Sequence, residues 1–284
     1  MRRRAFLGMV GAAALAGCSG EDSPGADSTA TPTPTATTTG TQGSAEFEFV
    51  GVEIADTVQL NVPESFALGV RNVGSAEGTF TSPLRTKLGD GEWNTAGDIS
   101  MTIPAGEPGE WRSARFAPSY LETIRFHLVA FDEQWSIQAV PKELDFGLQY
   151  NVPTGLRLNA LGGSFETEYP TATNETATNG TAVTPTAAPD GETWAVMRLD
   201  VRNRLREPLT APEASEFVLE VDGERRSQHQ SVSDNPYEGG TLDARTVRRG
   251  DLVYAVPEGT RVRDLTFRWE SSLPDGDVKV IWTK

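Results

Sequence analysis

The chain has 284 residues and a formal charge of −15, with 40 acidic residues against 25 basic ones. Nucleic acids and anionic lipid surfaces attract proteins through clustered bases that neutralise phosphates, and no Lys/Arg stripe is apparent in this sequence. We therefore expect no nucleic acid among its partners. At about 150 residues per domain, the length suits two domains.

The first seventeen residues have the composition of an export signal. Arg2, Arg3 and Arg4 precede an apolar run over residues 5–16, which is shorter than the roughly 20 residues that a membrane-spanning helix needs. Arg3 and Arg4, with the Ala-Phe-Leu that follows them, resemble a twin-arginine signal, which an export receptor reads. The resemblance implies that the protein is exported already folded.

Residues 15–18 read Leu-Ala-Gly-Cys and resemble a lipobox. The resemblance implies cleavage after residue 17, lipid on the sulfur of Cys18, and attachment to the extracellular face of the cell membrane. Cys18 is the only cysteine, so a disulfide within one chain is impossible although an exterior compartment would permit one. The alternative is a chance cysteine inside a cleaved peptide.

Two stretches are too polar to form a core. Residues 18–45 consist mainly of Ser, Thr, Pro, Gly and Ala, a composition that predicts a disordered tether. A second Thr-rich stretch, over residues 169–191, is expected as an insertion in the folded region. It holds two N-glycosylation acceptor sequences, at Asn174 and Asn179. We expect a glycan on at least one of them; the alternative is an unmodified loop.

Lysine is scarce, since 21 of the 25 basic residues are arginine. This balance resembles proteins of halophilic archaea. At about 1 M salt the Debye length is about 3 Å, so repulsion among surface carboxylates is largely screened. The composition therefore predicts a fold that is adapted to brine.

The remainder of the chain has the pattern of β-strands. Residues 66–72 and 194–203 alternate apolar and polar side chains with period two, and both segments end in Val-Arg-Asn. Matching segments recur in the same order at offsets of 131, 138 and 141 residues, which favours an internal duplication over residues 46–140 and 144–284. Hairpin turns are expected at Asp90-Gly91, Asp222-Gly223 and Asp275-Gly276, and one helical turn at residues 213–216.

The chain resembles immunoglobulin-like modules of prokaryotic surface lipoproteins in three features: the Val-Arg-Asn turn, the acidic and Gly-rich segment after it, and the final aliphatic–aromatic strand. The first half is similar to adhesion-related domains. The second half, through residues 217–223 and 250–257, is similar to an uncharacterised extracellular family. The resemblance implies an all-β chain of two immunoglobulin-like antiparallel β-sandwiches and supplies no functional residues.

Few residues have the arrangement of a catalytic or metal site. His127 and His229 lack partners at ligand spacing, and no Gly-x-Ser-x-Gly sequence offers a nucleophile. The neighbouring Asp132 and Glu133 could serve a glycosidase, but chance pairing is expected among 40 acids. Calcium at the Asp-Gly sites is the alternative to simple hairpins. We therefore expect no catalytic residue, metal or cofactor. We expect most of the six tryptophans to lie in the cores, whereas an exposed tryptophan would suit contact with a glycan or a protein.

These observations favour a non-catalytic surface lipoprotein that makes protein–protein or envelope contacts, with an unknown envelope protein or glycan as partner. The alternative is a ligand-capturing accessory subunit of a transporter, although such binders usually have two α/β lobes. An envelope hydrolase with a site in the strand loops is a third hypothesis.

Overall fold

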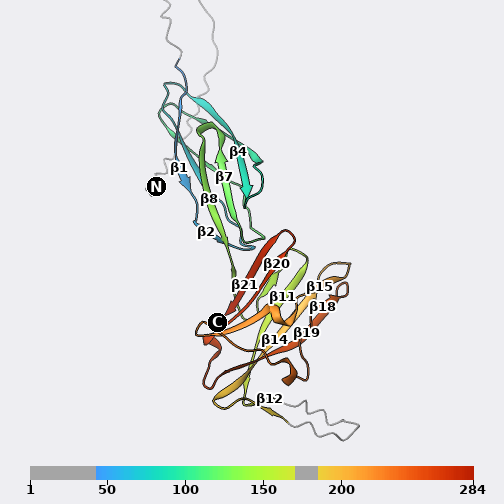
Figure 1. Cartoon of the computed structure of the whole chain (residues 1–284). Coiled ribbons are helices and arrows are strands. Elements are labelled where there is room, and N and C mark those ends of the chain that lie inside the picture. The colour runs from blue at the N-terminus through green and yellow to red at the C-terminus, as the bar shows by residue number, and fades with distance from the viewer. Residues whose placement is uncertain (1–42, 170–184) are drawn as a thin grey trace, which may run out of the picture. The chain divides into compact units, whose positions relative to one another are not determined.

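The structure is a computed structural model that describes residues 43–169 and 185–284 (Figure 1). Arg3, Arg4, Cys18, the predicted tether up to residue 42 and the acceptors Asn174 and Asn179 lie outside the described residues. The described residues form strands and four short 3-10 helices. The prediction of an all-β chain of antiparallel sheets is therefore confirmed.

The first sandwich packs a three-stranded sheet, in the order β1-β3-β6, against a five-stranded sheet, in the order β2-β8-β7-β4-β5. Its core contains Leu68 and Val70 from one sheet and Phe80, Ile124 and Ile137 from the other. Its elements are β1 (Phe47–Glu53), β2 (Thr57–Gln59), β3 (Ala67–Asn72), β4 (Gly78–Leu88), β5 (Asn94–Ile103), β6 (Pro108–Arg112), β7 (Thr123–Leu128), η1 (Val129–Phe131) and β8 (Glu133–Val140).

The second sandwich packs the sheet β10-β11-β14-β19 against the sheet β17-β16-β20-β21-β9. Its core includes Met197 and Leu199 from one sheet and Phe267, Trp269 and Trp282 from the other. Its elements are β9 (Lys142–Asp145), β10 (Gln149–Asn151), β11 (Leu156–Glu166), β12 (Glu168–Tyr169), β13 (Thr186–Ala187), β14 (Glu192–Asn203), β15 (Leu209–Ala211), η2 (Ala214–Glu216), β16 (Phe217–Val221), β17 (Glu224–Arg225), η3 (Gln230–Val232), β18 (Gly240–Leu242), β19 (Val247–Pro257), η4 (Val262–Asp264), β20 (Leu265–Leu273) and β21 (Gly276–Thr283).

The two sandwiches share one strand arrangement but differ in the order of their first strands, because β1 precedes β2 whereas β11, its counterpart, follows β9. The order β2-β8-β7-β4-β5 corresponds to β9-β21-β20-β16-β17, and β1-β3-β6 corresponds to β11-β14-β19. In each large sheet the first-named edge strand pairs in parallel with the last strand of its sandwich, β2 with β8 and β9 with β21. This agreement supports the internal duplication that the sequence predicts.

The repeated Val-Arg-Asn sequence has the same structural role in both copies. Asn72 and Asn203 are buried at the ends of β3 and β14. Each side-chain oxygen accepts a bond from the backbone N–H two residues later, and each side-chain nitrogen donates to the carbonyl four residues later. Each side-chain nitrogen also donates to a backbone carbonyl of another strand, that of Ile103 in the first copy and that of Leu242 in the second. The motif is thus a buried polar corner that fixes the turn.

The predicted turns are confirmed. All three Asp-Gly pairs lie where one strand turns into its antiparallel partner, Gly276 being the first residue of β21. Asp222 and Gly223 have φ values of 53° and 80°, which a tight hairpin turn requires. Residues 214–216 form η2, with reciprocal capping between Glu213 and Glu216. The strand β6 ends at Arg112, and beyond it Phe116 forms an isolated bridge with Glu64.

Candidate binding surface

The outer face of the sheet β10-β11-β14-β19 is the best candidate for a functional site. Along β14, residues 195, 197, 199 and 201 point into the core, so residues 194 to 202 with even numbers lie on the outer face. Strand pairing places Asp251 beside Arg198 and Arg249 beside Asp200 on that face. This outer face has an apolar end and a charged end.

The charged end carries more arginine than carboxylate. Its bases and acids are Arg157, Arg198, Arg202, Arg204, Arg249, Asp200 and Asp251, a set that we call the arginine face and that has a formal charge of +3. The side chains of Arg198 and Arg249 are 65% and 67% exposed, and their carboxylate partners, Asp251 and Asp200, are only 10% and 23% exposed. The guanidinium groups therefore form the outer layer of this face.

Three of the five arginines have no carboxylate partner among the residues that the structure describes. Nε of Arg157 and a terminal nitrogen of Arg204 both donate to one neutral atom, the side-chain oxygen of Asn151, at 3.3 Å and 3.2 Å. Arg202 is exposed between them and Arg249. Two guanidinium groups on one amide oxygen leave their positive charge uncompensated. This end of the sheet is therefore suited to receive anionic groups, which arginine can bind in bidentate geometry.

The apolar end is covered by the chain itself. Tyr169, Trp194, Val196, Val253 and Ala255 form a small buried cluster on the outer face. A stretch of chain over residues 227–237 hydrogen-bonds along the free edge of β19 and closes this cluster. The cover supports the neighbouring arginine face but leaves it open to solvent.

Asp251 lies where the two ends of the face meet. Its carboxylate accepts from Nε of Arg198 at 3.4 Å and lies 3.4 Å from the hydroxyl of Tyr169. That hydroxyl also contacts Ser233 and Asp234, at 3.0 Å and 3.1 Å. Burial is the main cause of a raised pKa for Tyr169, so the hydroxyl stays protonated and acts as a donor at neutral pH. The network fixes the position from which Arg198 extends.

The equivalent face of the first sandwich is not cationic. On the outer side of β1-β3-β6, Glu48 lies opposite Arg71, and Arg112 pairs with Glu110 at 2.8 Å. These four side chains sum to a formal charge of zero. Arg71 holds the position in the first copy that Arg202 holds in the second. The arginine face is therefore a property of one copy and not a consequence of the shared topology.

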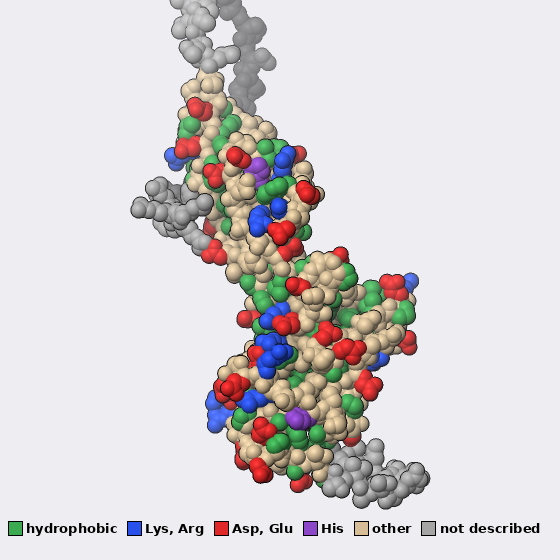
Figure 2. All heavy atoms as spheres, in the orientation of Figure 1, with side chains coloured by type: hydrophobic (Ala, Val, Ile, Leu, Met, Phe, Trp, Pro, Cys, Tyr) green, Lys and Arg blue, Asp and Glu red, His purple; other side chains and the backbone are tan. Residues whose placement is uncertain are grey.

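On the other sheet of the second sandwich, two of the four bases pair with acids; Lys142 instead bonds to Gln59, and Arg225 forms no ion pair with a described residue. Arg268 contacts Glu220 at 2.5 Å, and Lys279 contacts Glu270 at 3.0 Å. Figure 2 shows one face of the molecule, on which acidic side chains are widely spread and the basic side chains of the lower sandwich gather mainly toward one side. The paired charges of this sheet neutralise one another and contribute little to attraction of a partner. The excess of unpaired arginine is what distinguishes the arginine face.

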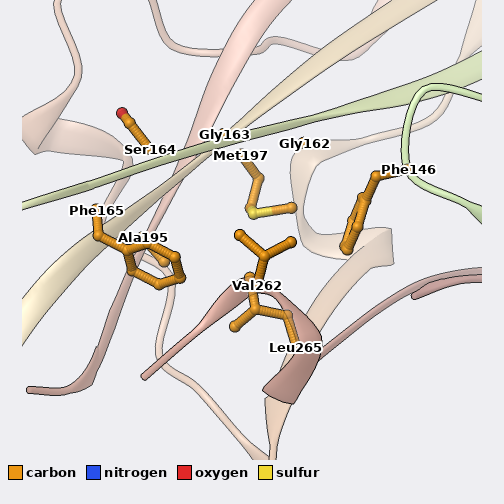
Figure 3. Close-up of a pocket in the computed structure, with 9 residues that line it drawn as sticks. All are labelled: Phe146, Gly162, Gly163, Ser164, Phe165, Ala195, Met197, Val262 and Leu265. Atoms are coloured by element: carbon orange, nitrogen blue, oxygen red, sulfur yellow. The ribbon is translucent and has the colours of Figure 1, made fainter. Parts of the chain in front are cut away.

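Two hollows in the described residues do not have the form of a small-molecule site. The first lies within the second sandwich and is lined by Phe146, Phe165 and Met197 among others (Figure 3). Its volume is about 10 Å³, enough for about one water molecule. The second, of about 360 Å³, is an open polar hollow beside Glu53, Glu64 and Arg112. A typical ligand site combines an enclosed apolar volume with a few convergent polar groups, and neither hollow does.

Of the remaining candidate residues, the structure brings His127 and Asp132 together and places His229 in the other sandwich. His127 contacts Asp132 at 2.9 Å and packs near Trp93, while His229 packs near Trp194 with ring centroids 5.1 Å apart. Within residues 43–169 and 185–284, no three His, Cys, Asp or Glu side chains gather as they would around a metal ion. The same residues include no helix that is long and apolar enough to cross a membrane.

The arginine face was missed at the level of sequence. Its members come from two distant parts of the chain, residues 157–204 and 249–251, and strand pairing alone brings them together. One local signal was present, because Arg198, Asp200 and Arg202 alternate with the apolar residues of their strand.

No family model matches the chain, and no curated protein matches it in sequence. Solved structures resemble it only distantly. A β-sandwich protein of Clostridium difficile matches at 14% identity and a TM-score of 0.33; the match covers 51% of this chain and 94% of the Clostridium chain. A lipoprotein candidate of Bacillus subtilis matches at 12% identity and a TM-score of 0.34, over 49% of this chain and 39% of its own. Red sea bream transglutaminase matches at 13% identity and a TM-score of 0.33, over 84% of this chain and 31% of its own.

Proposed function

We propose that the protein is a non-catalytic surface lipoprotein, anchored by lipid on Cys18, that binds an acidic protein of the cell envelope through the arginine face. The observation that carries the proposal is the excess of exposed, unpaired arginine on one sheet face of a chain whose total charge is −15. An open sheet face suits a macromolecule better than a small ligand. Arginine is also the base best suited to bind carboxylates in a fixed geometry.

The anchor and the face have complementary roles in this proposal. The N-terminal lipid holds the chain at the membrane, and the Thr/Pro-rich segment before β1 allows the sandwiches to reach partners at a distance. The acidic remainder of the surface repels anionic proteins that approach from other directions. A partner is thereby directed to the arginine face.

The direct test uses immobilised poly-L-glutamate as the probe and the purified chain in solution. Arg202→Glu reverses one exposed charge without breaking an ion pair, and Arg71→Glu is the matched control at the equivalent position of the first sandwich. We expect Arg202→Glu to weaken binding about tenfold, since each exposed charge pair contributes about 0.2–1 kcal/mol and reversal replaces attraction with repulsion. Equal weakening by Arg71→Glu would show that total charge, and not this face, controls binding.

A second experiment tests the anchor in cells. The native chain and a Cys18→Ser variant are cross-linked in place, and the neighbours of each are identified. We expect the native chain in the membrane fraction with one dominant acidic partner, and the variant in the soluble fraction without it. A variant that stays in the membrane fraction would contradict lipid anchoring through Cys18.

A further inference from the structure

The strand β5 presents a long backbone edge that no described residue covers. It has ten residues, and it pairs only with β4, on one side of the strand. Eight of its ten side chains are exposed or half-buried, and Asp98 is its only charged residue. Among residues 43–169 and 185–284, the only side-chain bond to a β5 backbone group comes from Asn72, which donates to the carbonyl of Ile103. Unpaired edges of this kind are templates for another strand.

Most other sheet edges are shorter, more charged or covered, whereas β5 has one charge and a bulge at Ala96, after which residues 97–103 pair regularly with β4. In the first sandwich, β2 has three residues, β6 begins with Pro108, and β1 carries two glutamates and a bulge. In the second, β9, β10 and β17 have four, three and two residues. The long edge strand β19 is covered by hydrogen bonds from residues 227–237. Proteins normally shorten, charge, bend or cover their edges. In β5 the bulge at Ala96 and the charge of Asp98 still leave residues 97–103 as a regular edge that no described residue pairs with.

Pro83 indicates which β5 groups point outward. It lies opposite Asp98 and has no N–H, so the two residues cannot exchange the two bonds of a hydrogen-bonded pair. Pair types alternate along an antiparallel ladder, so Ser100 and Thr102, two and four residues after Asp98, also form non-hydrogen-bonded pairs with β4. Oγ1 of Thr102 lies 3.0 Å from Oγ1 of Thr79, as expected where side chains approach closely in non-hydrogen-bonded pairs. The N–H and C=O groups of Asp98, Ser100 and Thr102 are therefore directed away from β4.

We propose that β5 pairs with β5 of a second copy of this chain, in an antiparallel register centred on Ser100. In this register Ser100 faces its own copy, and Asp98 of each chain faces Thr102 of the other, so about six N–H···O bonds form. Ile99 of each chain faces Met101 of the other and extends the apolar layer of the sheet. A register centred on Asp98 would place two carboxylates opposite each other, which is destabilising. The edge is thus self-complementary, as a two-fold interface requires.

The test measures the mass of the full chain in detergent by sedimentation equilibrium, from about 1 μM to about 1 mM, at about 1 M salt to screen repulsion between acidic surfaces. We expect a concentration-dependent dimer. Ser100→Pro removes an outward N–H from both copies and no bond to β4, so it should weaken the dimer by about 10- to 100-fold. Ser100→Ala keeps the N–H and is the matched control, which should dimerise like the native chain.

Hydrogen exchange provides a readout that needs no variant. Dimerisation should slow exchange at the amides of Asp98, Ser100 and Thr102 as the protein concentration rises, and it should leave Ile99 and Met101 little changed, because their N–H groups already face β4. This measurement decides the case if Ser100→Pro fails to fold. A monomer at every concentration, a dimer unaffected by Ser100→Pro, or exchange at Ser100 that is independent of concentration would overturn the proposal.

Discussion

Replacement of Asn203 by alanine tests whether the repeated Val-Arg-Asn motif stabilises the sandwich through its buried corner. The side-chain nitrogen of Asn203 donates to the carbonyls of Glu207 at 2.7 Å, Leu242 at 3.1 Å and Asp243 at 3.2 Å, and its oxygen accepts from the N–H of Leu205 at 2.8 Å. Alanine would leave the three carbonyls and the N–H of Leu205 without their bonds to the Asn203 side chain. Of these bonds, the one to the Leu242 carbonyl is fully buried.

A buried polar group without a partner costs about 1–3 kcal/mol. Because the other three groups lie nearer to solvent and can regain water, we expect Asn203→Ala to lower the free energy of unfolding by about 2–4 kcal/mol. The assay is urea unfolding, followed by the fluorescence of the buried Trp269 and Trp282, at about 1 M salt.

Asn159 supplies the matched control on the same sheet. Its side-chain oxygen is buried without a hydrogen-bond partner among the described residues, so Asn159→Ala should change the free energy of unfolding by less than about 0.5 kcal/mol, or should stabilise the protein. An Asn203→Ala variant no less stable than Asn159→Ala would refute the interpretation of the motif as a stabilising corner.

Three further predictions follow from the packing, the burial and the composition of the chain. A Cβ atom at Gly163 would lie 1.5 Å from the Val196 carbonyl oxygen, so Gly163→Ala should lower the free energy of unfolding by about 1–3 kcal/mol, measured by urea unfolding. Burial, with a smaller contribution from Tyr120, raises the pKa of Tyr150 to about 12, above the ordinary value of about 10. The stability that depends on the neutral phenol should therefore be complete below pH 10 and fall as the pH rises through 12, and Tyr150→Phe should reduce that loss in an alkaline titration followed by circular dichroism. The brine adaptation that we propose predicts loss of the β circular-dichroism signal on dialysis to low salt, and an unchanged signal in fresh buffer would contradict it.

Local patterns predicted several strands and turns because these elements depend on neighbouring residues. Period-two alternation located β3 and β14, and the Asp-Gly pairs located three hairpins. Pairing in register depends on residues far apart in the chain, and this is why Arg157, Arg202 and Arg249 could not be predicted to share one face.

Salt decides which property of the arginine face can select a partner. If the chain works in brine, as its composition leads us to propose, charges beyond about 3 Å from one another are screened at about 1 M salt. Long-range attraction then contributes little, and selection depends on direct contact. Arginine suits this condition, because its planar guanidinium donates two parallel hydrogen bonds to a carboxylate, whereas the lysine ammonium acts as a point charge. Arg157 and Arg204 share a single neutral acceptor and keep donors free for such contacts. In the function and brine adaptation that we propose, the preference for arginine therefore has a physical use at this face, since it preserves recognition where charge alone is screened.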